Sequence, residues 1–411
     1  MRLKVFLSYM FLLVALPAYQ SVGQECAVEN VVAEDASIGC VSKSESADTP
    51  DQIFLDSILY SDNGITFQPV YYGEVFTNAH GGISTSNSTH YEGLLDLSLS
   101  FDLEKLNAPI PGQINVLFQN THGRGLEQNV GATQIISSID SLNNITQMSE
   151  LWWEVDLYET GITMRIGRQD LSSEFVTMDT ASDFINSAFG LSPSAGLPSF
   201  PAPSPAVVLM TDLSSDFSVR AGIWDAYRSN EAGIFSDNGS ALLIGEFEYR
   251  YSTPLRQLPG ILTAGITYET PGEVPSGAIP RAYGYYFQYE QMLIREAGCD
   301  TDNPQGLSAF AQHFPTYSSG NSPFPLIPRD ALAGITYTGL IRNRDADVTG
   351  AGAGWVDLDQ GGTDQEVMIE VFYKAIVNEN LIIQPDLQYI TTPSGIYPDA
   401  FVAGIRFQLN L

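Results

Sequence analysis

Two neighbouring segments of this chain carry polar or aromatic side chains at every second position, the spacing of one face of a β-strand. In the first segment these positions are Glu150, Trp152, Glu154 and Asp156. In the second they are Thr163 and Arg165, which the turn between the segments would bring opposite the acidic row. Carboxylates accept hydrogen bonds from hydroxyl groups, arginine donates them, and tryptophan offers a flat apolar surface. Such a row could exchange the water shell of a neutral polyol for weak, replaceable contacts.

Further segments repeat this alternation, and we predict that their polar side chains line the same inner wall. The predicted lining comprises Trp152, Glu154, Asp156, Arg165, Arg168, Arg220, Glu246, Glu248, Arg250, Glu290, Glu366, Glu370, Gln384, Asp386, Gln388 and Arg406. Two interpretations are open. The set selects a solute, or its acid–base pairs neutralise one another and stiffen the wall.

The strands that must carry these rows are typical of a membrane barrel. Residues 401–411 alternate almost without error between apolar residues, such as Phe407 and Leu409, and small or polar ones, such as Arg406. Lipid would contact one face and a water-filled lumen the other, and ring closure leaves no unpaired backbone edge. Arginine or lysine on the lipid face costs roughly 2–4 kcal/mol at the midplane, which favours placing the charges inside. We predict an all-β fold, a transmembrane antiparallel barrel of about sixteen strands.

The connections between the predicted strands supply a second test. The tightest are 159–161, 213–216 and 378–380, and the longest are 121–148 and 171–205. With both chain ends on the periplasmic side, short and long connections fall on opposite rims, as in outer-membrane barrels.

The long segment 171–205 follows the fifth predicted strand and is therefore the third outer loop. It is rich in phenylalanine and ends in a proline- and glycine-rich stretch, so exposure to water would be costly. We predict that it folds inward and narrows the pore; the alternative is a loop packed over the outer rim. The predicted constriction residues are Asp170, Phe175, Asp183, Phe184, Asn186 and Phe189.

The N-terminal residues predict export. Arg2 and Lys4 precede an apolar run, and Ser21–Gly23 offers small residues for cleavage. We therefore expect a signal peptide over 1–23, an acidic periplasmic leader with a short helix over 24–63, and a barrel over 64–411 in the outer membrane of a Gram-negative bacterium.

Several functions are disfavoured. A net charge of −30 opposes nucleic-acid binding. The four histidines show no metal-ligand spacing, and no Gly-x-Ser-x-Gly motif occurs. Carboxylates follow the whole predicted wall instead of forming one catalytic pair. We expect no enzymatic activity, no metal and no cofactor.

Several motifs, in this order, resemble the carbohydrate-selective porin family, the OprB-like porins. They are Gly167–Asp170 continuing to Pro201, Gln291–Leu293 with Gln305–Leu307, Gly339–Ile341 with Arg344–Asp347, and Ile382–Ile390 followed by Pro393 and Gly395. The last block is the most specific. The resemblance covers most of the chain from about residue 64 onward and implies a sixteen-stranded outer-membrane channel for sugars such as glucose, with a constricting third loop.

The expected partners are small sugars, outer-membrane lipid, and the barrel-assembly machinery acting on the C-terminal strand. The protein would be a monomer or a homotrimer. The strand pattern is equally consistent with two other functions. One is a general or cation-preferring porin without a true sugar site, and the other is a barrel whose loops plug the lumen.

Overall fold

The computed structural model describes residues 60–61, 63–226, 240–274, 277–279, 281–296, 305–318, 327–358 and 365–411. The predicted signal peptide and nearly all of the predicted leader, including the expected helix up to residue 59, lie outside the described residues. The first described element is β1 (Tyr60–Ser61), which pairs with the start of β2.

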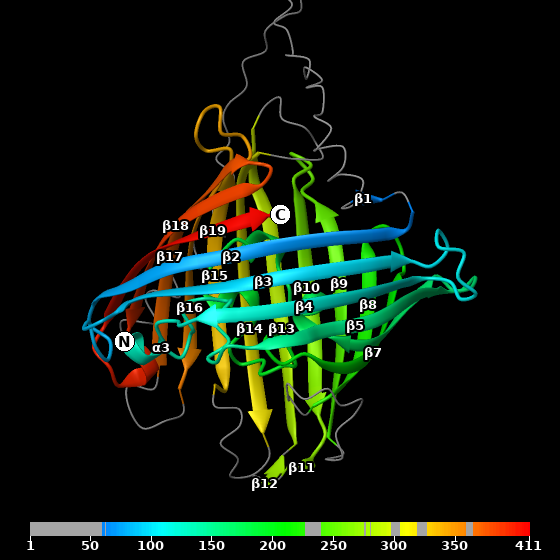
Figure 1. Cartoon of the computed structure of the whole chain (residues 1–411), viewed down its shortest axis with the longest axis horizontal. Coiled ribbons are helices and arrows are strands. Elements are labelled where there is room, and N and C mark those ends of the chain that lie inside the picture. Colours follow the sequence, from blue (N-terminus) through cyan, green and yellow to red (C-terminus); the bar gives the residue numbers. More distant parts are fainter. Residues whose placement is uncertain are drawn as a thin grey trace, which may run out of the picture. The chain divides into compact units, whose positions relative to one another are not determined.

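Sixteen long strands form a closed antiparallel barrel (Figure 1), as the alternation predicted. The strands are β2 (Ile65–His80), β3 (Thr89–Asp102), β4 (Gln113–Gly123), β5 (Thr146–Leu157), β6 (Ile162–Gln169), β7 (Ser204–Asp212), β8 (Phe217–Asp225), β9 (Ala241–Ser252), β10 (Pro259–Glu269), β13 (Ala282–Arg295), β14 (Gly306–Ser318), β15 (Arg329–Thr338), β16 (Val348–Asp357), β17 (Gln365–Asn378), β18 (Leu381–Thr391) and β19 (Ala400–Asn410). Each strand pairs with the next, and β19 pairs with β2 to close the ring.

The two faces of the wall are distinguished by burial. In β18, Leu387 is 48% exposed, whereas its neighbours Asp386 and Gln388 are 1% and 0% exposed. Apolar side chains are thus outside and polar ones inside, the reverse of a water-soluble protein and the arrangement that lipid requires. Antiparallel pairing carries this parity around the ring, because directly paired residues share a face.

The connections alternate between two rims. One rim, the turn rim, carries short connections such as 158–161, 213–216 and 379–380. The other, the loop rim, carries loop 2 (residues 124–145) and loop 3 (residues 170–203). This separation matches the predicted parity, and loop 3 follows the fifth barrel strand.

The remaining elements are short. They are a hairpin of β11 (Gly272–Val274) and β12 (Gly277–Ile279), the α-helical turns α3 (Glu127–Val130) and α4 (Ser187–Gly190), and the 3-10 turns η1 (Leu171–Ser173), η2 (Asp179–Ala181) and η3 (Pro393–Gly395). In the described part of the chain, no helix has the length and apolar character needed to cross a membrane.

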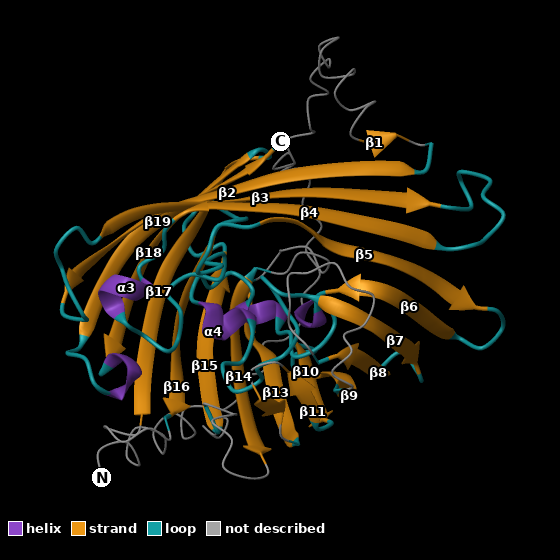
Figure 2. Ribbon diagram, turned by 60° about the horizontal axis from the view of Figure 1, so that its bottom comes forward, coloured by secondary structure: helices purple, strands orange, loops and turns teal. Residues whose placement is uncertain are grey.

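Loops 2 and 3 pack against the inner wall, and α4 of loop 3 lies among the barrel strands in Figure 2. Phe184, Ile185 and Phe189 of loop 3 join one apolar cluster with inner residues of β14–β19. Phe175 joins a second cluster with Trp224 and Tyr286. Phe175, Phe184 and Phe189 of loop 3 are therefore buried.

A row of glycines on the inner face of β16 makes room for these rings. A Cβ added at Gly352 would lie 2.8 Å from Phe189 and 2.9 Å from Phe184. A Cβ at Gly350 would lie 3.2 Å from Phe184. Since these glycines recur at every second position, they form a shallow channel in the wall into which the two stacked phenylalanines fit.

Candidate functional site

Arg165 of β6 is the centre of the polar set on the inner wall. Its guanidinium contacts the Glu154 carboxylate at 2.6 Å and the Glu174 carboxylate of loop 3 at 2.8 Å. It also lies 4.2 Å from the centre of the Trp152 ring. Alternation predicted Arg165 opposite the acidic row of β5, and its direct partner across the β5–β6 hairpin is Glu154. One face of the indole is therefore covered by a cation and is not open to solute.

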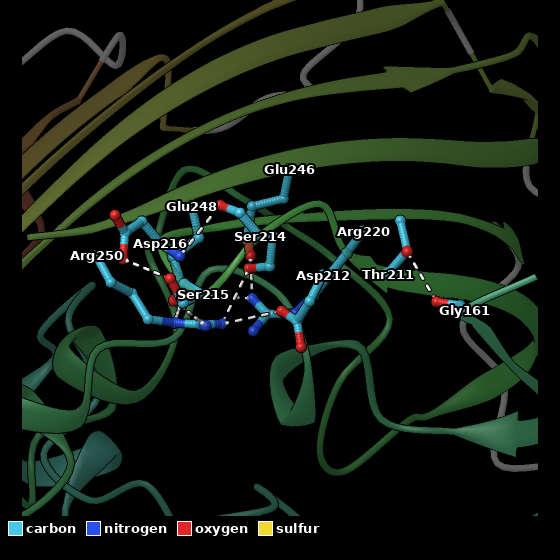
Figure 3. A network of polar contacts seen from close by, with 11 residues as sticks. Gly161, Thr211, Asp212, Ser214, Ser215, Asp216, Arg220, Glu246, Glu248 and Arg250 are labelled. Atoms are coloured by element: carbon cyan, nitrogen blue, oxygen red, sulfur yellow. Dashed lines mark hydrogen bonds and ion pairs between the residues drawn. The ribbon is translucent and has the colours of Figure 1, made fainter.

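A second network continues the charged row on β8 and β9 (Figure 3). Arg220 Nη1 contacts Glu246 at 2.7 Å and Glu248 at 3.2 Å, and Arg250 Nε donates to Glu248 at 2.7 Å. Arg250 also reaches Asp212 at 3.4 Å, near the turn rim. Cations and carboxylates therefore alternate along this part of the wall.

Other wall carboxylates hold loop 3 by its backbone. Glu246 accepts from the N–H of Val176 at 3.1 Å, and Glu290 accepts from that of Thr180 at 2.6 Å. Each link gives a loop amide, buried at Val176 and partly buried at Thr180, a charged acceptor on the wall. For Glu246 and Glu290 the structure therefore supports a structural role.

The polar residues of β17–β19 do the same for both loops. Glu370 accepts from the backbone N–H groups of Ile185 and Asn186 at 2.6 and 2.9 Å. Glu366 accepts from the N–H groups of Thr133 and Gln134, both at 2.8 Å.

Side-chain amides extend this system. Gln384 donates to the Asp183 carbonyl at 2.7 Å, and Gln388 donates to the Ile136 carbonyl at 2.9 Å and to Asp386 at 3.0 Å. Arg406 is paired with Glu74. All of these predicted lining residues face inward, but little solvent reaches most of them.

The predicted constriction residues lie at the joint between loop 3 and the wall. Phe184 stacks on Phe189 with ring centres 4.1 Å apart, and Asp183 pairs with Lys374 of β17 at 2.5 Å. Phe175 packs edge-on against Trp224. The rings fasten the loop to the wall.

Two other predicted constriction residues order the loop itself. The Asn186 side chain caps α4 by accepting from the N–H of Ala188 at 3.1 Å, and it donates to Gln388 at 2.9 Å. Asp170 accepts from the N–H groups of Ser172 and Phe200 at 2.8 and 2.6 Å. Both ends of loop 3 are therefore tied together before the segment meets the wall.

Arg168 departs from its predicted place. It pairs directly with Leu151, whose side chain is 42% exposed on the outer face. Its Nε donates to the backbone carbonyl of Ser149 at 3.1 Å. Residues three apart in a strand face opposite sides, so Arg168 does not share the face of Arg165.

Sequence reasoning missed several important groups. Buried Asp330 accepts from the hydroxyl of Ser192 and from the N–H of Ser194, the latter at 2.9 Å. Loop 2 was not predicted to contact the wall, yet it binds Glu366. The alternating glycines Gly350 and Gly352 in β16 are a sequence signal that would have located the part of the wall against which loop 3 packs.

An acid pair lies in loop 2. Burial, with a hydrogen bond and the negative charge of Asp140, raises the pKa of Glu127 to about 9. Glu127 is therefore largely protonated at neutral pH, and this part of the loop is less negative than its sequence indicates.

Comparison with known proteins places this architecture in a family. The sequence profile of the carbohydrate-selective porin family, OprB, matches residues 86–411. The chain belongs to this family. Within it, the chain is 22% identical to Porin B of Pseudomonas aeruginosa, over 84% of this chain and 87% of that protein. It is also 20% identical to the putative porin QuiX of Acinetobacter baylyi, over 84% and 89%.

Solved structures of this porin family share the fold. The high-pH structure of Pseudomonas putida OprB superposes with a TM-score of 0.75 at 19% identity, covering 88% of this chain and 97% of that one. The low-pH structure of the same protein gives a TM-score of 0.60 at 18% identity, with the same coverage. Membership of the carbohydrate-selective porin family, rather than the fold alone, makes the chain an outer-membrane channel protein.

Proposed function

We propose that this porin lets small sugars of the glucose type, single or in short oligomers, diffuse passively through a lumen lined by interleaved acidic, basic and aromatic residues. The observation that carries the proposal is the arrangement around Arg165. A cation, two carboxylates and an indole ring meet where loop 3 approaches the wall. This set can exchange hydrogen bonds with hydroxyl groups, and Arg165 offsets one of the two carboxylate charges, which leaves a single negative charge.

The open part of the lining supports the same function. Glu154 keeps about a quarter of its side chain exposed, Arg250 keeps 40%, and Asp156 is exposed. These groups stay available to solute, whereas the buried carboxylates of β17 bind the backbone of the loops. Loop 3 narrows the passage beside them.

The test is single-channel conductance of the purified, refolded protein in planar bilayers, titrated with glucose and with a disaccharide. We expect stepwise conductance that glucose reduces in a saturable way. Conductance indifferent to sugars would leave a general or cation-preferring porin, the second candidate, which the acidic composition favours. Folded protein that conducts nothing would indicate a barrel plugged by its loops.

We also propose how the channel reaches the outer membrane. Export would use the N-terminal signal peptide, and assembly would use the alternating C-terminal strand β19 as its recognition element. Lipid would then surround the exposed apolar face. The test is removal of residues 1–23, which should leave the protein inside the cell, outside the outer-membrane fraction.

A further inference from the structure

A cavity of about 340 Å³ lies between loops 2 and 3, apart from the Arg165 and Arg220 networks described above. Six hydroxyl side chains line it: Thr133, Ser138, Ser172, Ser187, Ser192 and Ser199. Leu191 and Phe200 add apolar surface. Within the described part of the chain, no charged residue lines it. The volume is at the lower end of the range for small-molecule sites, which suits one sugar ring.

At one end of the cavity, the hydroxyl protons are already donated in hydrogen bonds within the protein. Ser172 Oγ donates its only proton to Asp170 at 2.7 Å. In the 2.8 Å contact between Ser172 and Ser199, Ser199 must therefore be the donor. Both oxygens keep lone pairs, because a hydroxyl has one proton and two acceptor positions.

Two further lining hydroxyls, those of Ser192 and Thr133, follow the same logic. Ser192 donates to the carboxylate of Asp330. Ser394 gives its proton to the Gly131 carbonyl at 2.7 Å, so Thr133 must donate in its 3.2 Å contact with Ser394. Ser192 and Thr133 thus also retain acceptors.

Ser138 and Ser187 differ from these residues. Ser138 accepts from Arg406 at 3.3 Å and keeps a proton to donate. Among the described hydrogen bonds none uses the Ser187 hydroxyl, which lines the cavity and also keeps its proton. Four of the six hydroxyls therefore offer only lone pairs to a ligand, and two can donate.

A ligand for such a cavity must bring its own protons. A neutral polyol does so with every hydroxyl group, and it can still accept from Ser138. The carboxylate of an acidic sugar has no proton to give at neutral pH and would meet mainly oxygen lone pairs, and the cation behind Ser138, Arg406, is already paired with Glu74. Phe200 and Leu191 can contact the carbon face of the ring.

We infer that this cavity binds one neutral sugar ring on the loop-rim side of the constriction, and that it discriminates against anionic sugars. The inference rests on the proposed channel function. It adds a second sugar-binding site along the channel and assigns the discrimination between neutral and acidic sugars to serines of loops 2 and 3.

Gly190 allows a clean test. It lines the cavity, and a Cβ added there would have no other atom within 4 Å. Gly190→Leu should fill the cavity without disturbing the loop, and Gly190→Ala is its matched control. The double variant Ser187→Ala/Ser199→Ala removes two lining hydroxyls. Ser173→Ala is the control for it, because Ser173 lies beside Ser172 but is exposed outside the cavity.

The readout is the concentration of glucose that half-saturates channel block, measured beside titration calorimetry with glucose and with gluconate. We expect Gly190→Leu and the double variant to weaken glucose binding by about tenfold, while both controls stay within roughly twofold of the parent. Gluconate should bind the parent at least about tenfold more weakly than glucose.

The outcomes separate the two proposals. Saturable glucose block in the parent that neither variant changes would overturn the cavity and leave the channel function standing. Gluconate binding as tight as glucose binding would overturn the selectivity. A parent channel that glucose never blocks would overturn both, and circular dichroism of each variant shows that its barrel is folded.

Discussion

At the scale of single residues, Arg165 decides what the open lining offers to solute. Its guanidinium satisfies Glu154 and Glu174, which are 26% and 20% exposed at their side chains. The same group covers one face of Trp152. Arg165 therefore keeps two carboxylates from acting as free anions and limits the indole to a single accessible face.

We expect Arg165→Met to make the channel more cation-preferring and to weaken glucose block. The two freed carboxylates attract cations, and the donor for sugar hydroxyl oxygens is lost. Because both carboxylates are partly exposed, the loss of stability should stay near the low end for ion pairs, about 1 kcal/mol.

Reversal potential in a salt gradient, combined with glucose titration, measures both effects of Arg165→Met. Arg329→Met is the matched control, since this exposed arginine pairs with Asp357 away from the indole. An unchanged ion preference in Arg165→Met would contradict the assignment.

The sequence was informative about which face a residue takes. Period-two alternation put Glu154 with Arg165, and Glu370 with Gln388, on one face of the wall, and each is a direct pair across neighbouring strands. It could also have corrected Arg168, which is an odd number of residues from Arg165. It could not show that Glu370 binds backbone amides, since strand pattern contains no information about which loop reaches a side chain.

At the scale of elements, loop 3 is built as a rigid part of the wall. Glu370 accepts from two consecutive loop amides, and the glycine row of β16 receives Phe184 and Phe189. The sequence predicted that the aromatic loop would be buried. The position at which the loop packs on the wall depends on contacts between segments far apart in the chain, such as residues 185 and 370. No local sequence pattern encodes such contacts.

Glu370→Ala should loosen loop 3. Two buried N–H groups would lose their acceptor, at a cost of roughly 1–3 kcal/mol each. We expect noisier and larger single-channel currents, weaker glucose block and faster proteolysis within residues 170–203. Glu379→Ala, in an exposed turn at the other rim, is the control. Currents identical to those of the parent would show that the loop is held without this carboxylate.

At the scale of the whole molecule, the excess of acidic residues affects a passing ion through the combined charge of the lumen more than through any single ion pair. The chain carries a net charge of −30, yet many inner carboxylates are paired with arginine or hold loop amides. Glu127 in loop 2 is also largely protonated at neutral pH. The field felt by an ion is therefore weaker than the formal charge suggests, but it keeps its negative sign.

We predict a moderate preference for potassium over chloride that shrinks as salt concentration rises. Screening reaches about 10 Å at 0.1 M and about 3 Å at 1 M, so exposed groups such as Asp156 and Glu154 influence a passing ion only at low salt. Reversal potentials across a fixed gradient, repeated at several mean concentrations, measure the effect. Anion preference at low salt would refute it. A preference independent of salt would place the selecting charges in contact with the ion instead of along the wall.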